Sequence, residues 1–184
     1  MPLVLDNEGD MLDKISAKRR YILIIIFCFL VLSLQLYPPN KKLFYLNLSA
    51  SFPRGIYRIQ KFKISDIQPG VVVIFDPPPV ARPLIYGRGW LPSGWPLIKY
   101  VGAVSGDTYA VEGSRFFING KHVGQVFTGD SEGKPLPVIK GTVKVKHGEF
   151  LPVSTHISNS FDGRYFGPVS LSAIRGKATP VWTY

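Results

Sequence analysis

Cysteine is almost absent from this chain of 184 residues, and the single one, Cys28, lies inside an apolar run. One cysteine excludes an internal disulfide framework and a cysteine-based metal site. The histidines His122, His147 and His156 are too far apart in the sequence to indicate a metal cluster. The sequence therefore gives no reason to expect a bound metal.

Acidic residues are also scarce: 12 Asp and Glu stand against 22 Lys and Arg, which gives a formal net charge of +10. The basic residues are dispersed, without a basic helix or an arginine-rich tract, so the charge does not indicate binding to nucleic acid. A solvated surface that is compatible with anionic lipid headgroups is the simpler interpretation.

Long apolar runs are limited to one. Tyr21–Tyr37 (YILIIIFCFLVLSLQLY) contains no charged residue and reaches the lower limit of about 17 residues for a membrane-spanning helix. Tyrosine at each end suits the two lipid–water interfaces, and the Pro38-Pro39 pair should stop the helix. We predict a single transmembrane anchor at residues 21–37.

The basic residues around this run predict its orientation. Four precede it and two follow it closely: Lys14, Lys18, Arg19 and Arg20 before, and Lys41 and Lys42 after. By the positive-inside rule, residues 1–20 form a cytoplasmic tail and residues 38–184 are exported. A cleaved signal peptide is the alternative, but residues 34–37 (LQLY) offer no small-x-small cleavage site, which favours an uncleaved anchor.

Beyond the run, strand signals outnumber helix signals. We expect strands at Gly55–Gln60, Val71–Phe75, Leu97–Val104, Thr108–Glu112, Arg115–Ile118, His122–Phe127, Thr142–Lys146 and Gly176–Trp182. Asn119-Gly120 is a strong signal for a two-residue hairpin between two of them. The sequence therefore predicts a mainly β domain, either a small barrel or packed sheets.

Residues 76–96 (DPPPVARPLIYGRGWLPSGWP) differ from the strand-rich remainder. Their prolines and glycines predict a long loop without regular structure. Trp90 and Trp95 would be costly to expose to water. One interpretation is a loop that dips into the membrane, because indole favours the lipid interface, or that covers the substrate. The other is that both tryptophans fold back onto the sheet.

Three segments carry candidate chemistry, and the first follows the apolar run. Residues 47–57 read NLSASFPRGIY, so Ser51 precedes Pro53 by two positions and Gly55 by four. Proline and glycine fix a tight, non-helical path that can hold Ser51 towards a bound peptide. Such turns are also common in ordinary loops, so this segment alone is weak evidence for a nucleophile.

The second segment places a lysine, Lys99, in the apolar stretch 96–104 (PLIKYVGAV). Because an ammonium group is expensive to bury, such a lysine would ordinarily point to solvent at a sheet edge. The alternative is that burial lowers the pKa of Lys99 and keeps its amine neutral, able to accept a proton.

The third segment, residues 159–169, reads NSFDGRYFGPV and comes before the last expected strand. It combines Ser160 with an acidic and a basic residue two positions apart, Asp162 and Arg164. Taken alone, this spacing is also compatible with an ordinary surface ion pair of small energetic value.

In this order, behind an apolar N-terminal run, the three segments resemble the serine, lysine and final boxes of signal peptidase I. The Ser-x-Pro-x-Gly-x-Tyr pattern at 51–57 is similar to the conjugative-transfer (TraF-type) branch. The resemblance covers residues 47–182 and implies a small signal-peptidase-like β domain behind a single transmembrane helix. It departs at residues 154–160 (STHISNS), which keep only the end of the family's Gly-Asp-Asn-Arg-Asp-Asn-Ser run.

The resemblance also implies a role for each candidate residue, without any cofactor. Ser51 would be the nucleophile and Lys99 its general base, with Ser160 orienting the lysine. Asp162 and Arg164 would form an ion pair that shapes the site. Ser49 would also support the reaction, because its hydroxyl and the Ser51 backbone N–H would together bind the oxyanion. His156 is the alternative base, because serine–histidine pairs are the commoner chemistry.

The implied function is endoproteolysis of a precursor leaving the membrane, with small residues at positions −1 and −3 from the cut. The precursor would be a pilin or another exported protein of conjugative transfer, cleaved with or without cyclisation at the periplasmic face of a bacterial inner membrane. Two alternatives stand beside it. One is a catalytically inactive peptidase-like assembly subunit; the other is a self-cleaving repressor-type Ser/Lys protease, which is soluble and would not need the apolar run.

Overall fold

The computed structural model describes residues 7–36 and 43–184. The chain divides into two compact units, Met1–Lys42 and Leu43–Tyr184. The first unit contains one helix, α1 (Asn7–Leu36), which includes most of the predicted anchor and also part of the predicted tail. Measured by length and hydropathy together, no helix in the described parts of the chain qualifies as a membrane span. The predicted helix end at Tyr37 and Pro38-Pro39 lies outside the described residues.

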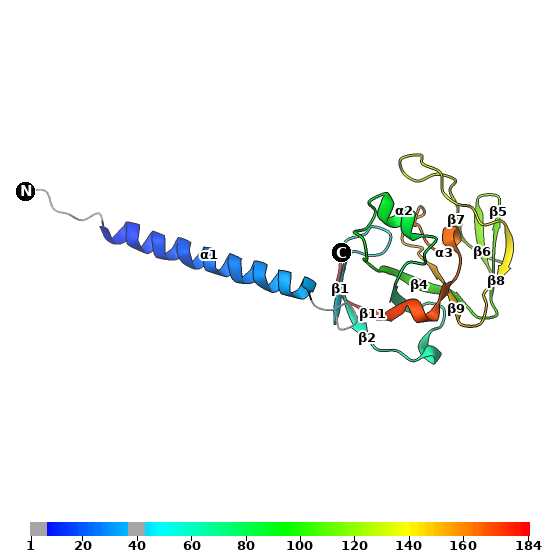
Figure 1. Cartoon of the computed structure of the whole chain (residues 1–184), viewed down its shortest axis with the longest axis horizontal. Coiled ribbons are helices and arrows are strands. Elements are labelled where there is room, and N and C mark those ends of the chain that lie inside the picture. Colours follow the sequence, from blue (N-terminus) through cyan, green and yellow to red (C-terminus); the bar gives the residue numbers. More distant parts are fainter. Residues whose placement is uncertain (1–6, 37–42) are drawn as a thin grey trace, which may run out of the picture. The chain divides into compact units, whose positions relative to one another are not determined.

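The second unit consists of two antiparallel sheets (Figure 1). The larger sheet has seven strands in the order β1-β2-β11-β3-β4-β9-β10, and the smaller has four in the order β7-β6-β5-β8. The strands of the larger sheet are β1 (Phe44–Asn47), β2 (Gly55–Gln60), β3 (Val72–Phe75), β4 (Leu97–Val104), β9 (Glu149–Val153), β10 (Val169–Ser170) and β11 (Ile174–Thr183). Those of the smaller sheet are β5 (Thr108–Glu112), β6 (Arg115–Ile118), β7 (Lys121–Gln125) and β8 (Gly141–Lys144).

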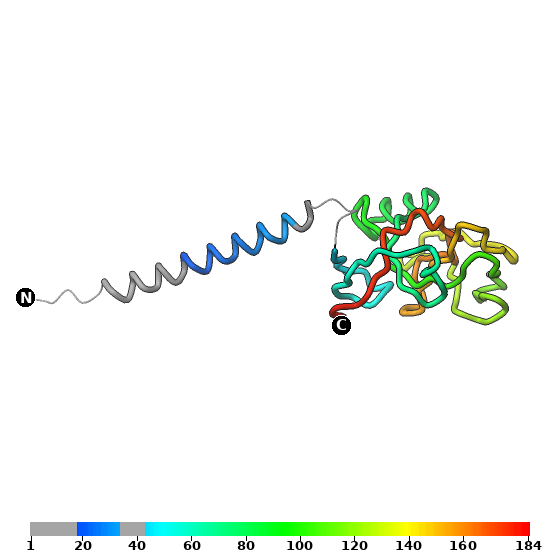
Figure 2. Tube along the Cα trace, turned by 90° about the horizontal axis from the view of Figure 1, so that it is seen from below, coloured from blue at the N-terminus to red at the C-terminus, as the bar shows by residue number. Residues whose placement is uncertain are grey.

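Two short α-helices and two 3-10 turns complete the unit: α2 (Arg82–Gly87), α3 (Gly163–Phe166), η2 (Ile64–Asp66) and η3 (Leu171–Ala173). The prediction of a mainly β domain is therefore confirmed. The last strand, β11, pairs with β2 near the start of the unit, so the two ends of the domain lie side by side, as the red and cyan segments show in Figure 2.

The interior of the larger sheet positions the site. Strand β4 lies between β3 and β9, and Lys99 pairs with Val73 of β3 in the register. Hydrophobic residues from these strands form one core cluster, among them Phe75 and Phe150, whose rings meet edge to face at 5.3 Å. No residue of β4 is exposed, so a polar side chain on this central strand lies within the core.

Most expected strands were correct within two residues, and the Asn119-Gly120 hairpin is confirmed: both residues have positive φ, 49° and 74°. Three strands, β1, β9 and β10, were missed. β9 contains Pro152, which lowers the strand signal, and β10 is only two residues long.

The prediction that 76–96 lacks regular structure was wrong in part, because this segment contains α2. Pro83 lies in the first turn of the helix, where the missing N–H has no intrahelical partner to lose. Trp90, which follows α2, is half-buried and packs on Phe161 with a ring-centroid distance of 5.1 Å. Trp95 is half-buried too. The structure thus favours the interpretation in which the tryptophans fold back onto the domain.

Candidate active site

The loop that carries Ser51 joins β1 to β2. Its shape depends on Asn47, a fully buried residue at the end of β1. The Asn47 Nδ2 donates to the carbonyl oxygens of Ser49, Phe52 and Pro53 at 2.9–3.1 Å, and its Oδ1 accepts the Ser49 N–H at 3.2 Å. Hydrogen bonds from one side chain to the backbone of the loop therefore fix the path of the chain on either side of Ser51.

Gly55 closes this loop at the start of β2. Its φ of 147° is a conformation that only glycine adopts readily, and a Cβ there would collide with the backbone carbonyl of Trp182 on β11. The glycine of the Ser-Phe-Pro-Arg-Gly motif is thus required by close packing of two strands, which holds the end of the Ser51 loop against the sheet.

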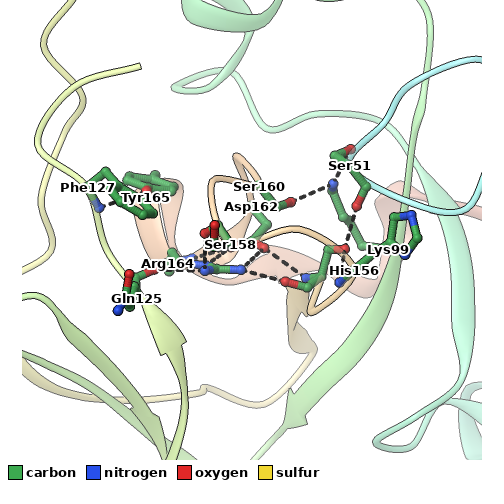
Figure 3. A network of polar contacts seen from close by, with 11 residues as sticks. Ser51, Lys99, Gln125, Phe127, His156, Ser158, Ser160, Asp162, Arg164 and Tyr165 are labelled. Atoms are coloured by element: carbon green, nitrogen blue, oxygen red, sulfur yellow. Dashed lines mark hydrogen bonds and ion pairs between the residues drawn. The ribbon is translucent and has the colours of Figure 1, made fainter. Parts of the chain in front are cut away.

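Ser51, Lys99 and Ser160 meet although they are far apart in the sequence (Figure 3). The Lys99 Nζ lies 2.6 Å from the Ser51 Oγ and donates to the Ser160 Oγ at 3.0 Å. Lys99 is only 1% exposed. The structure therefore rejects the interpretation in which this lysine points to solvent from a sheet edge.

Burial of Lys99 changes its acidity. Loss of solvation disfavours the ammonium and lowers the pKa of Lys99 from 10.5 to about 8; the nearby Asp162 opposes the shift and Arg164 adds to it. A substantial fraction of the amine is consequently neutral near pH 8. A neutral amine at hydrogen-bond distance from a serine hydroxyl can accept its proton.

Ser49 lies on the other side of Ser51. The two hydroxyl oxygens are 2.9 Å apart, and the Ser51 backbone N–H donates to the Ser49 Oγ at 3.3 Å. The two groups predicted to bind an oxyanion are therefore adjacent. They are hydrogen-bonded to each other in the free protein, so a substrate carbonyl oxygen must replace that contact to accept a bond from both.

Asp162 and Arg164 form a buried ion pair and not a surface pair. The Arg164 Nη2 lies 2.8 Å from the Asp162 Oδ2, and the Arg164 Nε donates to Oδ1 at 2.9 Å. The carboxylate also caps α3 by accepting the Arg164 backbone N–H. Such a bidentate pair inside the core has the geometry that compensates two desolvated charges.

This ion pair is joined to the nucleophile loop by Ser154, a fully buried residue directly after β9. Its N–H donates to the Asp162 Oδ2 at 2.8 Å, its carbonyl accepts from the Arg164 Nη2 at 2.6 Å, and its hydroxyl donates to the carbonyl oxygen of Ser51. Sequence reasoning assigned no role to Ser154 or Asn47, because both roles depend on contacts that the sequence does not show.

His156 follows Ser154 in the same loop. Its side chain is exposed, and only its backbone N–H is bonded, to the Ser154 Oγ at 3.4 Å. Within the described residues, no bond from its imidazole to Ser51 is found, whereas Lys99 makes one. The geometry favours Lys99 over His156 as the base. In the same part of the chain, no group of three His, Cys, Asp or Glu side chains gathers in a way that could hold a metal ion.

The resemblance to signal peptidase I implied a β domain with a lysine beside a loop serine, and comparison with known proteins tests the family to which the chain belongs. The chain belongs to the signal peptidase family, peptidase S26, whose model matches residues 17–183. The resemblance read from the three segments is thus confirmed at the level of the family.

Among its relatives, the conjugal transfer protein TraF of Agrobacterium fabrum is 36% identical over 148 residues, which are 76% of this chain and 82% of that protein. A plasmid transfer protein TraF of Escherichia coli is 30% identical over 149 residues, again 76% and 82%. The signal peptidase I V of Bacillus subtilis is 32% identical over 93 residues, 44% of this chain and 54% of that protein.

Among solved structures, a signal peptidase I from Enterococcus faecalis aligns with 65% of this chain and 100% of that one, with a TM-score of 0.39 and 19% identity. On the family match and the sequence relatives, the chain is an S26-family homologue of TraF proteins of conjugal and plasmid transfer.

Proposed function

We propose that this protein is a serine endopeptidase in which Ser51 is the nucleophile and Lys99 the general base. The carrying observation is the 2.6 Å separation of the Lys99 Nζ from the Ser51 Oγ, inside a core that lowers the lysine pKa to about 8. Neither feature is needed for folding alone, because a hydrophobic residue at position 99 would fill a central strand at lower cost.

The reaction is acyl transfer. The neutral amine of Lys99 takes the proton of the Ser51 hydroxyl while the oxygen attacks the scissile carbonyl, and the resulting ammonium later gives a proton to the leaving amine. Water then attacks the acyl-enzyme, again with Lys99 as base. If an amine of the same precursor attacks instead, the product is cyclic. Ser160 holds the lysine chain in position through its 3.0 Å hydrogen bond.

The oxyanion of the tetrahedral intermediate is bound by the Ser51 N–H and the Ser49 hydroxyl. These donors already lie together beside the nucleophile. Ser154 contributes indirectly, because its hydroxyl fixes the carbonyl of Ser51 and thereby the peptide plane after the nucleophile.

The proposed substrate is a precursor protein of a conjugative transfer system, such as a pilin, with small residues at −1 and −3 from the cut. The relatives named for conjugal and plasmid transfer, which cover 76% of this chain, support that setting.

The proposed location is the inner membrane, with residues 21–37 as the anchor, residues 1–20 in the cytoplasm and the domain from residue 38 in the periplasm. The side chains of residues 18–33 are all exposed, and most of those from Tyr21 to Leu32 are large and apolar. A helix that is apolar all round can be covered on every side by lipid.

A second apolar surface supports contact with lipid. The register of the β1-β2-β11 edge aligns Leu46, Ile56 and Trp182 in one row across three strands, and all three are exposed. Tyr184 lies beside Trp182 with a ring-centroid distance of 4.9 Å. Indole and phenol groups favour the lipid–water interface, so this edge suits a membrane surface.

To test the function, the full-length protein is co-expressed with a pilin precursor of a conjugative system and processing is followed by mass spectrometry. Ser51→Ala and Lys99→Ala are expected to abolish processing at unchanged protein level, while the exposed controls Ser93→Ala and Lys146→Ala process normally. The product mass separates cleavage from cyclisation. Processing by both site variants would show that Ser51 and Lys99 are not the nucleophile and the base. Absence of processing in the wild type as well as in the variants would favour the inactive assembly subunit.

A further inference from the structure

We infer that the cavity beside Ser51 binds one bulky apolar side chain of the precursor, so that a Leu, Met or Phe near the cut is recognised in addition to small residues. This inference rests on the proposed function and goes beyond it, because small residues at −1 and −3 would leave such a cavity empty.

The cavity has a volume of about 310 Å³ and Ser51 lies in its wall. A single water needs only about 10–15 Å³ of comparable space, and sites that hold whole ligands begin at roughly 300 Å³. The methyl group of alanine would occupy a minor part of it. The volume therefore suits a large side chain carried by the same peptide that presents its carbonyl to Ser51.

The chemistry of the wall selects an apolar occupant. Trp90 and Leu91, which follow α2, line the cavity, and so does Leu136 in the segment between β7 and β8. Phe161 also lines it, in edge contact with Trp90 and stacked on Tyr165 at 5.3 Å. Half-buried aromatic and aliphatic groups of this kind gain contact area and lose water when an apolar side chain enters.

Arg88 ties together two segments that line the cavity, the one after α2 and the loop at Asp130. Its Nη1 lies 2.6 Å from the Asp130 Oδ2, its Nη2 donates to the carbonyl of Pro135 at 2.7 Å, and its guanidinium lies 5.4 Å from the centre of the Trp90 ring. Asp130 is held in turn by the N–H groups of its own loop, including that of Lys134 at 2.9 Å. These contacts hold the segments that line the cavity in fixed positions in the domain.

A peptide bound in extended form points successive side chains to opposite sides. A single cavity next to the nucleophile therefore accepts the side chain at one fixed distance from the scissile bond. The expected signature is a preference for large apolar residues at one position near the cut, and not a general preference for apolar peptides.

The test uses full-length protein in detergent micelles and a complex peptide mixture, with every cut mapped by mass spectrometry. Ser51→Ala supplies the background. The wild type should cut peptides with Leu, Met or Phe at one position about tenfold or more faster than peptides with Gly there, the range that pocket contacts provide. Trp90→Ala enlarges the cavity and should extend the preference to Tyr and Trp.

Leu136→Trp fills the cavity and should remove the preference while cuts in peptides with Ala at that position persist. Val138→Trp, which changes an exposed residue outside the cavity wall, is the matched control. If Ser51-dependent cuts show no large-residue position, or Leu136→Trp and Val138→Trp behave alike, the inference is wrong and the peptidase function stands. If no cut depends on Ser51, both fail together.

Discussion

Two basic side chains are buried in the same domain, and they are accommodated in opposite ways. Lys99 is bonded to two serine hydroxyls, whereas Arg164 is paired with a carboxylate and donates to the carbonyl oxygens of Gln125, Ser154 and Ser158. Lysine can lose its proton when it is desolvated, but arginine cannot, so only arginine needs a full set of acceptors.

The difference shows how one core separates chemistry from support. The lysine, which is bonded to hydroxyls, is left with a lowered pKa. The arginine, which is paired with a carboxylate, stays charged and ties β7 to the loop between β9 and α3. Ser154 connects the two, since it bonds to the ion pair through its backbone and to Ser51 through its hydroxyl.

Lys99→Arg should have the largest effect, because it places a permanent cation where the proposed reaction needs a neutral amine. Processing of the precursor should fall by about a thousandfold, within the range of general-base contributions. Single-turnover kinetics with purified full-length protein measures this, with the exposed Lys146→Arg as control. Retention of activity in Lys99→Arg would show that position 99 is not the base.

Asp162→Asn should leave Arg164 buried without its charge partner, and the free energy of unfolding should fall by about 3–5 kcal/mol. Urea denaturation in detergent measures the change. Glu132→Gln provides the contrast, since its pair with Lys134 is exposed on both sides and should contribute about 0–1 kcal/mol. Equal effects of the two substitutions would mean that burial does not determine how much an ion pair contributes to the free energy of unfolding.

Raising the pH should increase the acylation rate through a midpoint near 8, because the neutral form of Lys99 is the active one and its pKa is about 8. Well below the midpoint the rate should fall about tenfold per pH unit, and since half of the amine is neutral at pH 8, the loss from pH 8 to pH 6 should be about fiftyfold. Rates of acylation by a reactive peptide ester measure this profile. A profile that is flat between pH 6 and 9 would contradict a lysine base.

Lys99→Met should make the protein more stable while abolishing processing. Because the pKa of Lys99 is lower in the folded state than its ordinary 10.5, the folded state disfavours the proton and burial costs stability at pH 7. Removing the amine should add about 1–3 kcal/mol to the free energy of unfolding, less than the full cost because two hydroxyls lose a partner.

The pH dependence of this gain tests its cause. The gain should be complete below pH 8 and should shrink as the pH rises towards 10.5, where the unfolded state also releases the proton. Urea titrations of wild type and Lys99→Met at pH 7 and pH 10 measure it. A gain that is the same at both values would point to packing and not to the buried charge.

Sequence reasoning found most of the strands and singled out Ser51 and Lys99, because each of these features has a local signal in the sequence. Lys99 is a lysine in an apolar strand, and Ser51 precedes a proline and a glycine. It missed Ser154 because the bond of that side chain to Ser51 spans 103 residues of sequence. Helix α2 was missed for the opposite reason: local proline and glycine signals indicated a loop, and packing of Ile85 into the core overrode them.

Ser160→Ala should have the smallest effect. It removes one of two hydrogen-bond partners of the Lys99 Nζ, and a bond of this kind contributes about 1 kcal/mol, which corresponds to roughly a threefold to tenfold slower reaction. Since Ser160 acts on the lysine and not on the precursor, kcat should fall with KM unchanged. Ser158→Ala, at an exposed position in the same loop, should change neither constant. A rise in KM with constant kcat would instead assign Ser160 to substrate binding and leave the Lys99 rotamer to be held by Ser51 alone.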